Sequence, residues 1–237
     1  MKKRKTSFFR RLYFDIINLL FPIVCAGCGR KLFFRHEVLC ITCETSLPKT
    51  NYHRMPWNPI EKKLFGRCNI ARASALYFSE KNTIVRSLLY NLKYKRNEML
   101  GKHLGLLFAR ELKDSLFAQY DLIIPVPLHP SKQRMRGFNQ CQPFAEGLSE
   151  GLGIQINNYS VYRKIANPSQ THLNRAERWD NVAGIFDVHE NENFRDRKIL
   201  LIDDVVTTGS TLEACAAAID KCCPKEISVL TIAVASS

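Results

Sequence analysis

The alternation of apolar and polar positions predicts strands and helices that follow one another from about residue 64 onward. Short apolar runs are typical of buried strands, and apolar residues three or four positions apart indicate amphipathic helices. The expected strands cover 73–78, 121–130, 198–203 and 226–235, and the expected helices cover 82–95, 99–117, 138–153 and 211–222. Buried strands that alternate with helices predict an α/β fold with a mainly parallel sheet flanked by helices.

Three regions of different composition predict the domain organisation. Residues 1–48 combine a basic, partly apolar segment with four clustered cysteines, and we expect them to form a small N-terminal module. Residues 49–63 are polar and contain prolines, which is typical of a linker. Residues 64–237 carry the α/β pattern and are expected to form one domain.

The N-terminal segment places six basic residues around an apolar run that Asp15, Asn18 and Pro22 interrupt. Such a run is too short and too broken for a transmembrane span, and no small-residue cleavage site of a secretory signal follows it. We expect a helix packed on its own domain, with a weak contact to a membrane surface or to nucleic acid as the alternative. A cytoplasmic location follows, in which cysteine thiols stay reduced.

The net charge of +13 changes the picture of the partners. A basic balance of this size favours nucleic acid, phosphorylated metabolites or an anionic membrane surface. A generally basic protein without such a partner is an equally good explanation. The composition is otherwise ordinary, with 46% hydrophobic residues, enough for a core, and 24% charged residues.

Two adjacent acids and a turn of small hydroxylic residues follow the apolar strand KILLI. Ligands of open α/β sheets bind at the carboxyl ends of strands, where Asp203 and Asp204 are expected. The turn Thr207–Thr211 would direct backbone N–H groups and hydroxyls into one concavity at a helix N-terminus, which suits a phosphate. Gly209 allows a close approach. The acids would accept hydrogen bonds from ribose hydroxyls or lie near a magnesium ion, so the pattern predicts a ribose 5-phosphate site.

Helix capping by a threonine or serine is the alternative, but it explains one hydroxyl rather than four and a paired carboxylate. The stretch ILLIDDVVTTGST resembles the phosphoribosyl pyrophosphate (PRPP) signature of type I phosphoribosyltransferases, with four apolar residues, two acids, two apolar residues and Thr-Thr-Gly-Ser-Thr. The resemblance implies that Asp203 and Asp204 contact the ribose hydroxyls. It assigns the 5-phosphate to Thr207, Thr208, Gly209, Ser210 and Thr211.

The stretch PVPLHP lies where such enzymes carry their pyrophosphate-binding loop, which implicates Pro127 and Leu128. The following Lys132, Arg134 and Arg136 are basic groups suited to a diphosphate. A solvated basic loop is the alternative for each of them.

The polar segment 161–186 has no convincing period, and its stretch NPSQTHLNRAERWDN lies where this fold carries a mobile catalytic loop. A lid is needed because water would otherwise capture the oxocarbenium-like centre of phosphoribosyl transfer. Arg175 and Arg178 could meet the departing pyrophosphate from this lid. We therefore assign them, with Asp203 and Asp204, to the catalytic set.

Two C-x-x-C pairs, Cys25 with Cys28 and Cys40 with Cys43, stand 11 residues apart. Four thiolates at this spacing can surround one zinc ion in tetrahedral geometry, and a shell completed by protein ligands is typical of a structural ion. Zinc fits better than disulfides or an iron–sulfur cluster. The five remaining cysteines are interpreted as core or incidental thiols.

A four-cysteine module followed by a PRPP motif, with LKYKRNEMLGKHLG and QTHLNRAERWDNVAGIF, is similar to the ComF family of ComFC- and GntX-like proteins over nearly the whole chain. The resemblance implies a cytoplasmic protein with a type I phosphoribosyltransferase fold, and some members serve in DNA uptake during natural competence. Partners would be PRPP or a related ribose phosphate, single-stranded DNA and competence proteins, with zinc as a structural ion and magnesium bound together with PRPP.

Three functions fit these observations. The first is a magnesium-dependent phosphoribosyltransferase in which a nitrogen acceptor attacks the anomeric carbon as pyrophosphate leaves. The second is a PRPP or nucleotide sensor that binds single-stranded DNA without turnover. The third is a zinc-held adaptor, which predicts no PRPP binding.

Overall fold

The computed structural model describes residues 22–33, 38–80, 83–164, 184–190 and 192–235. The chain divides into two units, 1–47 and 48–237, and each is described by itself. No helix in the described part of the chain is long and apolar enough to cross a membrane.

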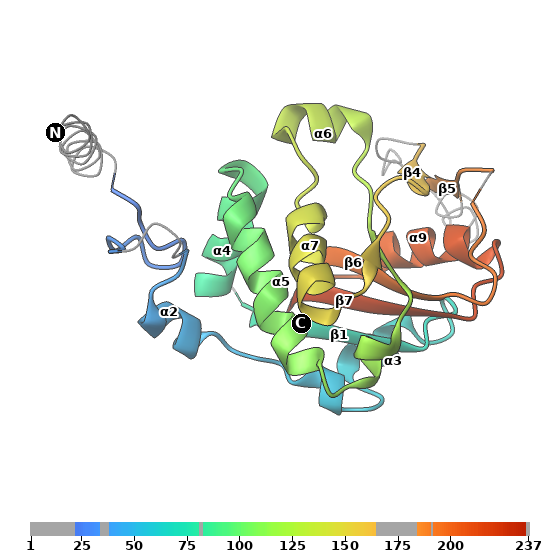
Figure 1. The fold of residues 1–237 in the computed structure, drawn as a ribbon, viewed down its shortest axis with the longest axis horizontal. Helices are drawn as coiled ribbons and strands as arrows, with labels where there is room; N and C mark the ends of the chain where they lie inside the picture. The colour runs from blue at the N-terminus through green and yellow to red at the C-terminus, as the bar shows by residue number, and fades with distance from the viewer. Residues whose placement is uncertain (1–21, 34–37, 81–82, 165–183, 191, 236–237) are drawn as a thin grey trace, which may run out of the picture. The chain divides into compact units, whose positions relative to one another are not determined.

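A parallel sheet forms the centre of the second unit (Figure 1). Its five strands among the described residues run in the order β1-β7-β6-β2-β3, and every neighbouring pair is parallel. Their bounds are β1 Arg72–Ser79, β7 Glu226–Ala235, β6 Lys198–Val206, β2 Leu122–Pro125 and β3 Gln155–Ile156. The mainly parallel α/β sheet predicted from the sequence is confirmed.

The register of the sheet places the acidic pair beyond the end of one neighbouring strand. Ile202 of β6 pairs with Pro125, the last residue of β2, whereas Asp203 still pairs with Thr231 of β7. On the β2 side, Asp203 and Asp204 therefore lie beside the loop that follows β2, whereas on the other side β6 remains paired with β7.

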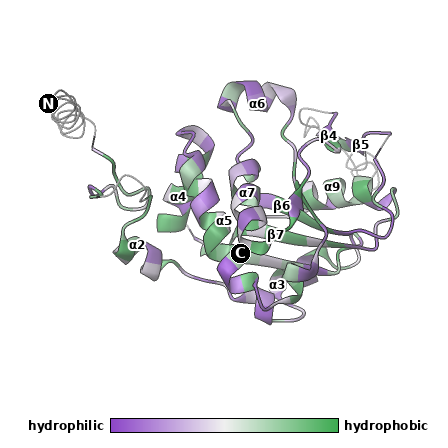
Figure 2. Ribbon diagram, viewed as in Figure 1, coloured by the Kyte–Doolittle hydropathy of each residue, from purple (hydrophilic) through white to green (hydrophobic). Residues whose placement is uncertain are grey.

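Helices cover both faces of this sheet. On one face α4 (Ile84–Tyr94), α5 (Glu98–Leu112) and α7 (Cys141–Leu152) pack together (Figure 1). On the other face the core combines β6 side chains Ile199 and Leu201 with apolar residues of α3, α9, β4 and β5. Their bounds are α3 Pro59–Leu64, α9 Ser210–Asp220, β4 Val161–Arg163 and β5 Phe186–Val188, the last two being an antiparallel pair. The apolar residues in Figure 2 follow this division, and β6 and β7 are green through their central parts.

The contact between α5 and α7 depends on glycines. A Cβ added to Gly105 would lie 2.8 Å from the Cα of Gly147 and closer still to the carbonyl oxygen of Phe144. A Cβ on Gly147 would lie 2.9 Å from the Cα of Gly105. The two helices therefore approach with backbone against backbone, which only residues without a side chain permit.

The segment 49–63, interpreted from its composition as a linker, is folded in the second unit. It carries the 3-10 helix η1 (Tyr52–Arg54) and most of α3. Asn58 is fully buried, donates to the carbonyl oxygen of Ala73 in β1 at 2.8 Å, and caps α3 by accepting from the backbone N–H of Ile60 at 3.0 Å. Polar composition does not reveal this packing, because the polar side chains bond to the backbone of the sheet rather than to water.

Further elements of the second unit are η2 (Leu116–Gln119) and α6 (Pro130–Arg136). No residue of α6 is buried, and Figure 2 shows it mostly hydrophilic. In the first unit, α2 (Ile41–Ser46) follows a turn at 25–29 in which the Gly29 N–H donates to the Cys25 carbonyl oxygen at 2.9 Å. Val24 and Lys31 form an antiparallel bridge around this turn.

Candidate functional site

The hydroxylic turn joins β6 to α9 at the carboxyl edge of the sheet. Gly209, which has no side chain to cap the helix, is the N-cap of α9, with φ of 84°, and the Ser210 N–H donates to the Thr208 hydroxyl at 3.5 Å. Thr207, Thr208, Ser210 and Thr211 are exposed, and the Thr208 and Ser210 hydroxyl oxygens lie 2.6 Å apart. The helix begins at Ser210, one residue before the start expected from the sequence. One long hydrogen bond from Ser210 to Thr208 leaves the other exposed hydroxyls at this helix N-terminus unexplained by capping, which favours a ligand as their purpose.

Asp203 and Asp204 are both buried, and their surroundings differ. Successive side chains of a strand point to opposite faces. Asp204 accepts a hydrogen bond from the Gln140 amide at 3.0 Å and pairs with the Lys93 ammonium at 2.9 Å. Asp203 accepts from the Cys141 thiol, at 3.5 Å, and from the backbone N–H of Asp204 at 2.8 Å. Both acids therefore meet the N-terminal end of α7, Asp203 at Cys141 and Asp204 at Gln140, and only Asp204 has an ion-pair partner on α4.

The proton affinity of Asp203 reflects this burial. Desolvation and the neighbouring Asp204 carboxylate raise the pKa of Asp203 to about 7. Burial, and then Asp203 itself, also raise the pKa of the Cys141 thiol well above its usual range, so Cys141 remains a neutral donor. Asp203 is thus poised to change charge near neutral pH.

Four cations form a cluster, of which Lys93 pairs with Asp204 and Arg163 lies near Asp203. Lys93 comes from α4, Lys132 and Arg136 from α6, and Arg163 from β4. Burial lowers the pKa of Lys132, and the neighbouring Arg163, Arg136 and Lys93 lower it further, which shows that the four charges are close together. Burial also lowers the pKa of Arg163, while the Asp203 carboxylate opposes that shift. A cluster of cations beside two acids can accommodate a ligand that combines phosphate with hydroxyl groups.

The predicted pyrophosphate loop lies between β2 and α6. Pro127 and Leu128 are half-buried, and the amide of Asn139 donates to the Val126 carbonyl oxygen at 2.9 Å. Arg136 is half-buried, donates to the side-chain oxygen Oε1 of Gln140 at 2.9 Å, and its guanidinium carbon lies 5.9 Å from the ring centroid of Tyr94. Gln140 thereby joins Arg136 to Asp204.

Not every predicted site residue can be placed. Arg134 is exposed on α6, in contrast to the half-buried Lys132. Arg175 and Arg178 lie outside the described residues, as does the basic N-terminal segment up to residue 21. The catalytic assignment of these two arginines stays a prediction.

Several residues near the site were missed by the motif. Lys93, Gln140 and Cys141 contact the acids, and Lys63 and Arg67 donate to the carbonyl oxygens of Thr207 and Thr208 at 2.8 and 2.7 Å. These five residues lie 62 to 144 positions from their partners in the sequence. They carry no sequence signal of their own, so only the fold brings them to the site.

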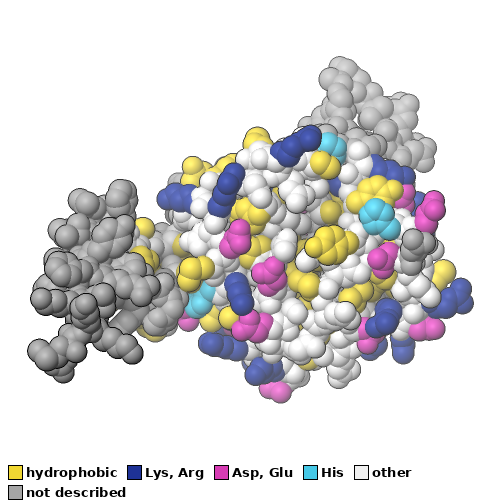
Figure 3. Space-filling view, turned by 45° about the horizontal axis from the view of Figure 1, so that its top comes forward, with side chains coloured by type: hydrophobic (Ala, Val, Ile, Leu, Met, Phe, Trp, Pro, Cys, Tyr) yellow, Lys and Arg dark blue, Asp and Glu magenta, His cyan; other side chains and the backbone are white. Residues whose placement is uncertain are grey.

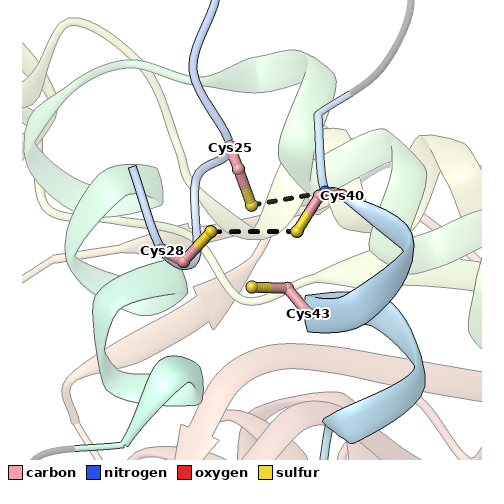
Figure 4. Close-up of side chains that lie close together, drawn as sticks. All are labelled: Cys25, Cys28, Cys40 and Cys43. Atoms are coloured by element: carbon pink, nitrogen blue, oxygen red, sulfur yellow. Dashed lines mark hydrogen bonds between the residues drawn. The ribbon is translucent and has the colours of Figure 1, made fainter. Parts of the chain in front are cut away.

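The four predicted zinc ligands of the first unit lie together (Figure 4). Their sulfur atoms are all within 4.8 Å of one another. The sulfurs of Cys28 and Cys40 are 3.8 Å apart, which matches the separation of about 3.8 Å that a tetrahedron with zinc–sulfur bonds of about 2.3 Å requires. The Cys40 N–H donates to the Cys25 sulfur at 3.3 Å. Such an arrangement fits a tetrahedral ion such as zinc.

The pKa shifts of two of these thiols differ: burial and the neighbouring cysteines raise the pKa of Cys43, whereas the pKa of Cys25 is lowered. Burial raises the pKa of Cys25, but backbone N–H groups of Cys28, Cys40 and Gly27 outweigh it and lower the pKa to about 6. The thiolate is the form that ligates metal. The residues present therefore fit a structural zinc ion.

Comparison with known proteins extends these observations. A model of the phosphoribosyl transferase domain matches residues 139–236, from the start of α7 to the end of β7. Competence protein F of Haemophilus influenzae is 31% identical over 151 residues, which are 62% of this chain and 66% of that protein. This chain belongs to the ComF family. It carries the phosphoribosyltransferase domain that the sequence motif indicated.

Two further proteins are similar to this ComF-family chain. Competence protein ComFC of Streptococcus pneumoniae is 23% identical over 202 residues, 82% of this chain and 86% of that protein. The crystal structure of a purine phosphoribosyltransferase from Pyrococcus horikoshii aligns at 21% identity over 56% of this chain and 73% of that one, with a TM-score of 0.38. The match to competence protein F spans just under two thirds of that relative's own length.

Proposed function

We propose that the second unit binds PRPP, or a related ribose phosphate, at the carboxyl edge of its sheet. The observation that carries the proposal is the exposed hydroxylic turn at the N-terminus of α9, one short stretch of strand from two buried acids. Thr207–Thr211 would hold the 5-phosphate, and Asp203 and Asp204 would accept hydrogen bonds from the ribose hydroxyls.

The remaining groups suit the diphosphate end of the same ligand. Lys132, Arg136 and Arg163 provide positive charge beside the acids, and the loop with Pro127 and Leu128 lies between β2 and the helix that carries two of these cations. A magnesium ion bound with PRPP would neutralise part of the diphosphate charge.

Phosphoribosyl transfer to a nitrogen acceptor is the reaction we propose for this ligand. The chain would contribute by fixing the ribose between the acids and the turn and by surrounding the leaving pyrophosphate with cations. The domain match to phosphoribosyl transferases supports the reaction class. Arg175 and Arg178 are proposed to act on the pyrophosphate from the segment 165–183, which lies outside the described residues.

The test is calorimetry with PRPP and magnesium on wild type and on Asp203→Asn/Asp204→Asn. Each lost hydrogen bond to a charged group is worth about 1.5–3 kcal/mol, so we expect affinity to fall at least tenfold. Asp121→Asn is the matched control, because Asp121 lies at the opposite edge of the sheet, where it accepts from the Lys198 N–H at 2.8 Å. Equal affinity of the double variant and wild type would remove the role of the acids.

A second function keeps the ligand without the reaction, as a sensor coupled to single-stranded DNA. Tyr90 and Tyr94 on α4 are 56% and 60% exposed, with ring centroids 5.0 Å apart, and Arg136 lies over Tyr94. Exposed rings beside cations can stack bases and track phosphates. The similarity to relatives named as competence proteins also supports a function connected with DNA.

The two functions predict different outcomes. An enzyme releases pyrophosphate when PRPP is supplied with an acceptor, whereas a sensor changes its DNA affinity and leaves PRPP intact. DNA binding through phosphates should weaken steeply with added salt. In the face drawn in Figure 3, lysines and arginines are scattered among acids rather than gathered in one patch, so DNA contact on that face would be local.

For the first unit we infer a structural zinc ion held by Cys25, Cys28, Cys40 and Cys43. The inference is supported by the mutual distances of their sulfur atoms and by the N–H donors to Cys25. A cytoplasmic location, where these thiols would stay reduced, belongs to the same proposal.

A further inference from the structure

The proposed phosphate turn is held from behind by residues just upstream of β1. The Lys63 ammonium, at the end of α3, donates to the Thr207 carbonyl oxygen at 2.8 Å. The Arg67 guanidinium donates to the Thr208 carbonyl oxygen at 2.7 Å. These contacts join residues 144 and 141 positions apart, so they are tertiary contacts made for this turn.

Peptide geometry gives these contacts a consequence for the other side of the turn. In a trans peptide the carbonyl and the N–H of one peptide unit point in opposite directions, and no cis peptide occurs among the described residues. A Thr207 carbonyl that points to Lys63 therefore turns the Thr208 N–H away from α3. In the same way, the bond from Arg67 to the Thr208 carbonyl turns the Gly209 N–H away from Arg67.

Both N–H groups are free to meet a ligand. Within the described part of the chain, neither the Thr208 N–H nor the Gly209 N–H donates to another residue. A carbonyl that accepts from a cation also polarises its peptide unit and strengthens the donor at the opposite end. Two such N–H groups, side by side at a helix N-terminus, are the donors that a phosphate oxygen requires.

Further contacts make this support rigid. Arg67 also forms an ion pair with Glu213 of α9, whose side chain is 9% exposed, so one guanidinium holds both the turn and the helix that follows it. Leu64 packs on the turn so closely that a Cβ on Gly209 would lie 2.8 Å from the Leu64 Cδ2. A planar guanidinium suits this double role, because its fork serves two acceptors at once.

The supporting segment is itself fixed to the sheet. Asn58 caps α3 and donates to the Ala73 carbonyl oxygen, while the Glu61 carboxylate accepts from the Ala73 N–H at 3.2 Å and from the Asn58 N–H at 3.2 Å. The position of Lys63 and Arg67 is therefore set by β1. This segment precedes the residues 139–236 that match the phosphoribosyl transferase model.

We propose that Lys63 and Arg67 are positioning residues that orient the Thr208 and Gly209 N–H groups toward the 5-phosphate. The inference rests on the proposed function, because it assigns the donors of that same phosphate site. It adds that the segment 58–67 completes the site by acting on the backbone of the turn.

The experiment measures ribose 5-phosphate affinity by calorimetry for wild type, Arg67→Gln, Lys63→Gln and the control Lys62→Gln. Lys62 is exposed on the same helix. Loss of a hydrogen bond from a charged donor should weaken binding about tenfold for Arg67→Gln and severalfold for Lys63→Gln, with Lys62→Gln at the wild-type value. Arg67→Lys keeps the charge but not the fork, so it should restore part of the affinity.

A second readout separates orientation from simple stability. In wild type, ribose 5-phosphate should shift the backbone amide resonances of Thr208 and Gly209, and in Arg67→Gln these shifts should shrink even where ligand saturates the protein. Urea unfolding of each variant shows whether it folds. If Arg67→Gln does not fold, Lys63→Gln replaces it in the test, because Lys63→Gln loses only a contact to the turn.

The outcomes distinguish two failures. Wild type that binds no ribose 5-phosphate would overturn the proposed function and this inference together. Wild type that binds, with Arg67→Gln and Lys63→Gln binding equally well or losing only stability, would overturn the inference and leave the phosphate site standing.

Discussion

Asp203 and Asp204 are adjacent in sequence but experience different electrostatic surroundings. Asp204 has the Lys93 ammonium and the Gln140 amide as partners. Asp203 is buried near Asp204, Cys141 and Cys215, with Lys93 and Arg163 as the nearby cations, and its pKa is raised to about 7. Asp204 thus has a lysine as its ion-pair partner, whereas the pKa of Asp203 is raised to near neutrality.

Affinity for ribose 5-phosphate should therefore depend on pH through Asp203. In the proposed site the Asp203 carboxylate would accept hydrogen bonds from ribose hydroxyls with full charge above pH 7, so affinity should rise as the pH passes through about 7. Calorimetry from about pH 5.5 to 8.5 measures the effect. Asp203→Asn should bind more weakly and lose this part of the dependence, while the titration of the ligand phosphate remains in both proteins.

Stability should show the opposite sign. The folded-state pKa of Asp203 lies above its unfolded value, so the folded state holds the proton more tightly. The resulting stabilisation is complete below the unfolded pKa of about 4 and is lost as the pH rises through about 7. The free energy of unfolding of wild type, relative to Asp203→Asn, should fall across that window. A difference that stays constant with pH would contradict the raised pKa.

At the residue scale the sequence predicted the acids and the turn, because they form one contiguous motif. It did not predict Lys93, Gln140, Lys63 or Arg67, which contact that motif from three separate segments. A lysine on a helix carries no mark that distinguishes an ion pair from a solvated face. Such partners become visible only when the register of the sheet and the positions of the helices are known.

Among the elements, the pair α5 and α7 offers the sharpest test of packing. Gly105→Ala adds a Cβ that would lie 2.8 Å from the Gly147 Cα, so the helices must separate. We expect a loss of about 1–3 kcal/mol in the free energy of unfolding, typical of overpacking, despite the better helix propensity of alanine.

Urea unfolding measures this loss, and Gly184→Ala is the matched control. A Cβ on Gly184 meets no atom of the described residues within 4 Å, and the φ of Gly184 is not in the left-handed region. The control should stay within about 0.5 kcal/mol of wild type. A Gly105→Ala protein as stable as the control would show that the two helices can move apart freely.

The long strands and helices were predictable because their apolar runs are unambiguous, as in β6 and β7. The short strands β4 and β5 were not, since three residues carry no measurable period. The helix α3 was not predicted, because its segment has the composition of a linker. Its polar residues Asn58 and Glu61 form hydrogen bonds with the backbone of β1 instead of with water. Polar residues that bond inside a protein cannot be told from solvated ones by composition.

For the molecule as a whole, the two units differ in what holds them together. The second unit has a continuous apolar core, whereas the buried apolar residues described in the first are few, including Leu32, Val38, Leu39 and Leu47. A small core of this kind usually needs a metal or another cross-link to fold.

Removal of one proposed zinc ligand should therefore unfold the first unit and spare the second. Cys25→Ser should lose one equivalent of zinc by metal analysis and become sensitive to proteolysis within residues 22–47, while the urea transition of the second unit stays unchanged. Cys223→Ser is the control, because Cys223 is an exposed thiol of the second unit. Full zinc in Cys25→Ser would contradict the four-cysteine site.

The strand order has a consequence for a truncated chain that keeps only the residues matched by the phosphoribosyl transferase domain. Residues 139–236 retain β6 and β7 but omit β1 and β2, the strands that flank them. In such a fragment the outer edges of β6 and β7 would have no hydrogen-bonded neighbour, and unpaired edges of long apolar strands promote association between copies. Expressed alone, it should accumulate as insoluble material.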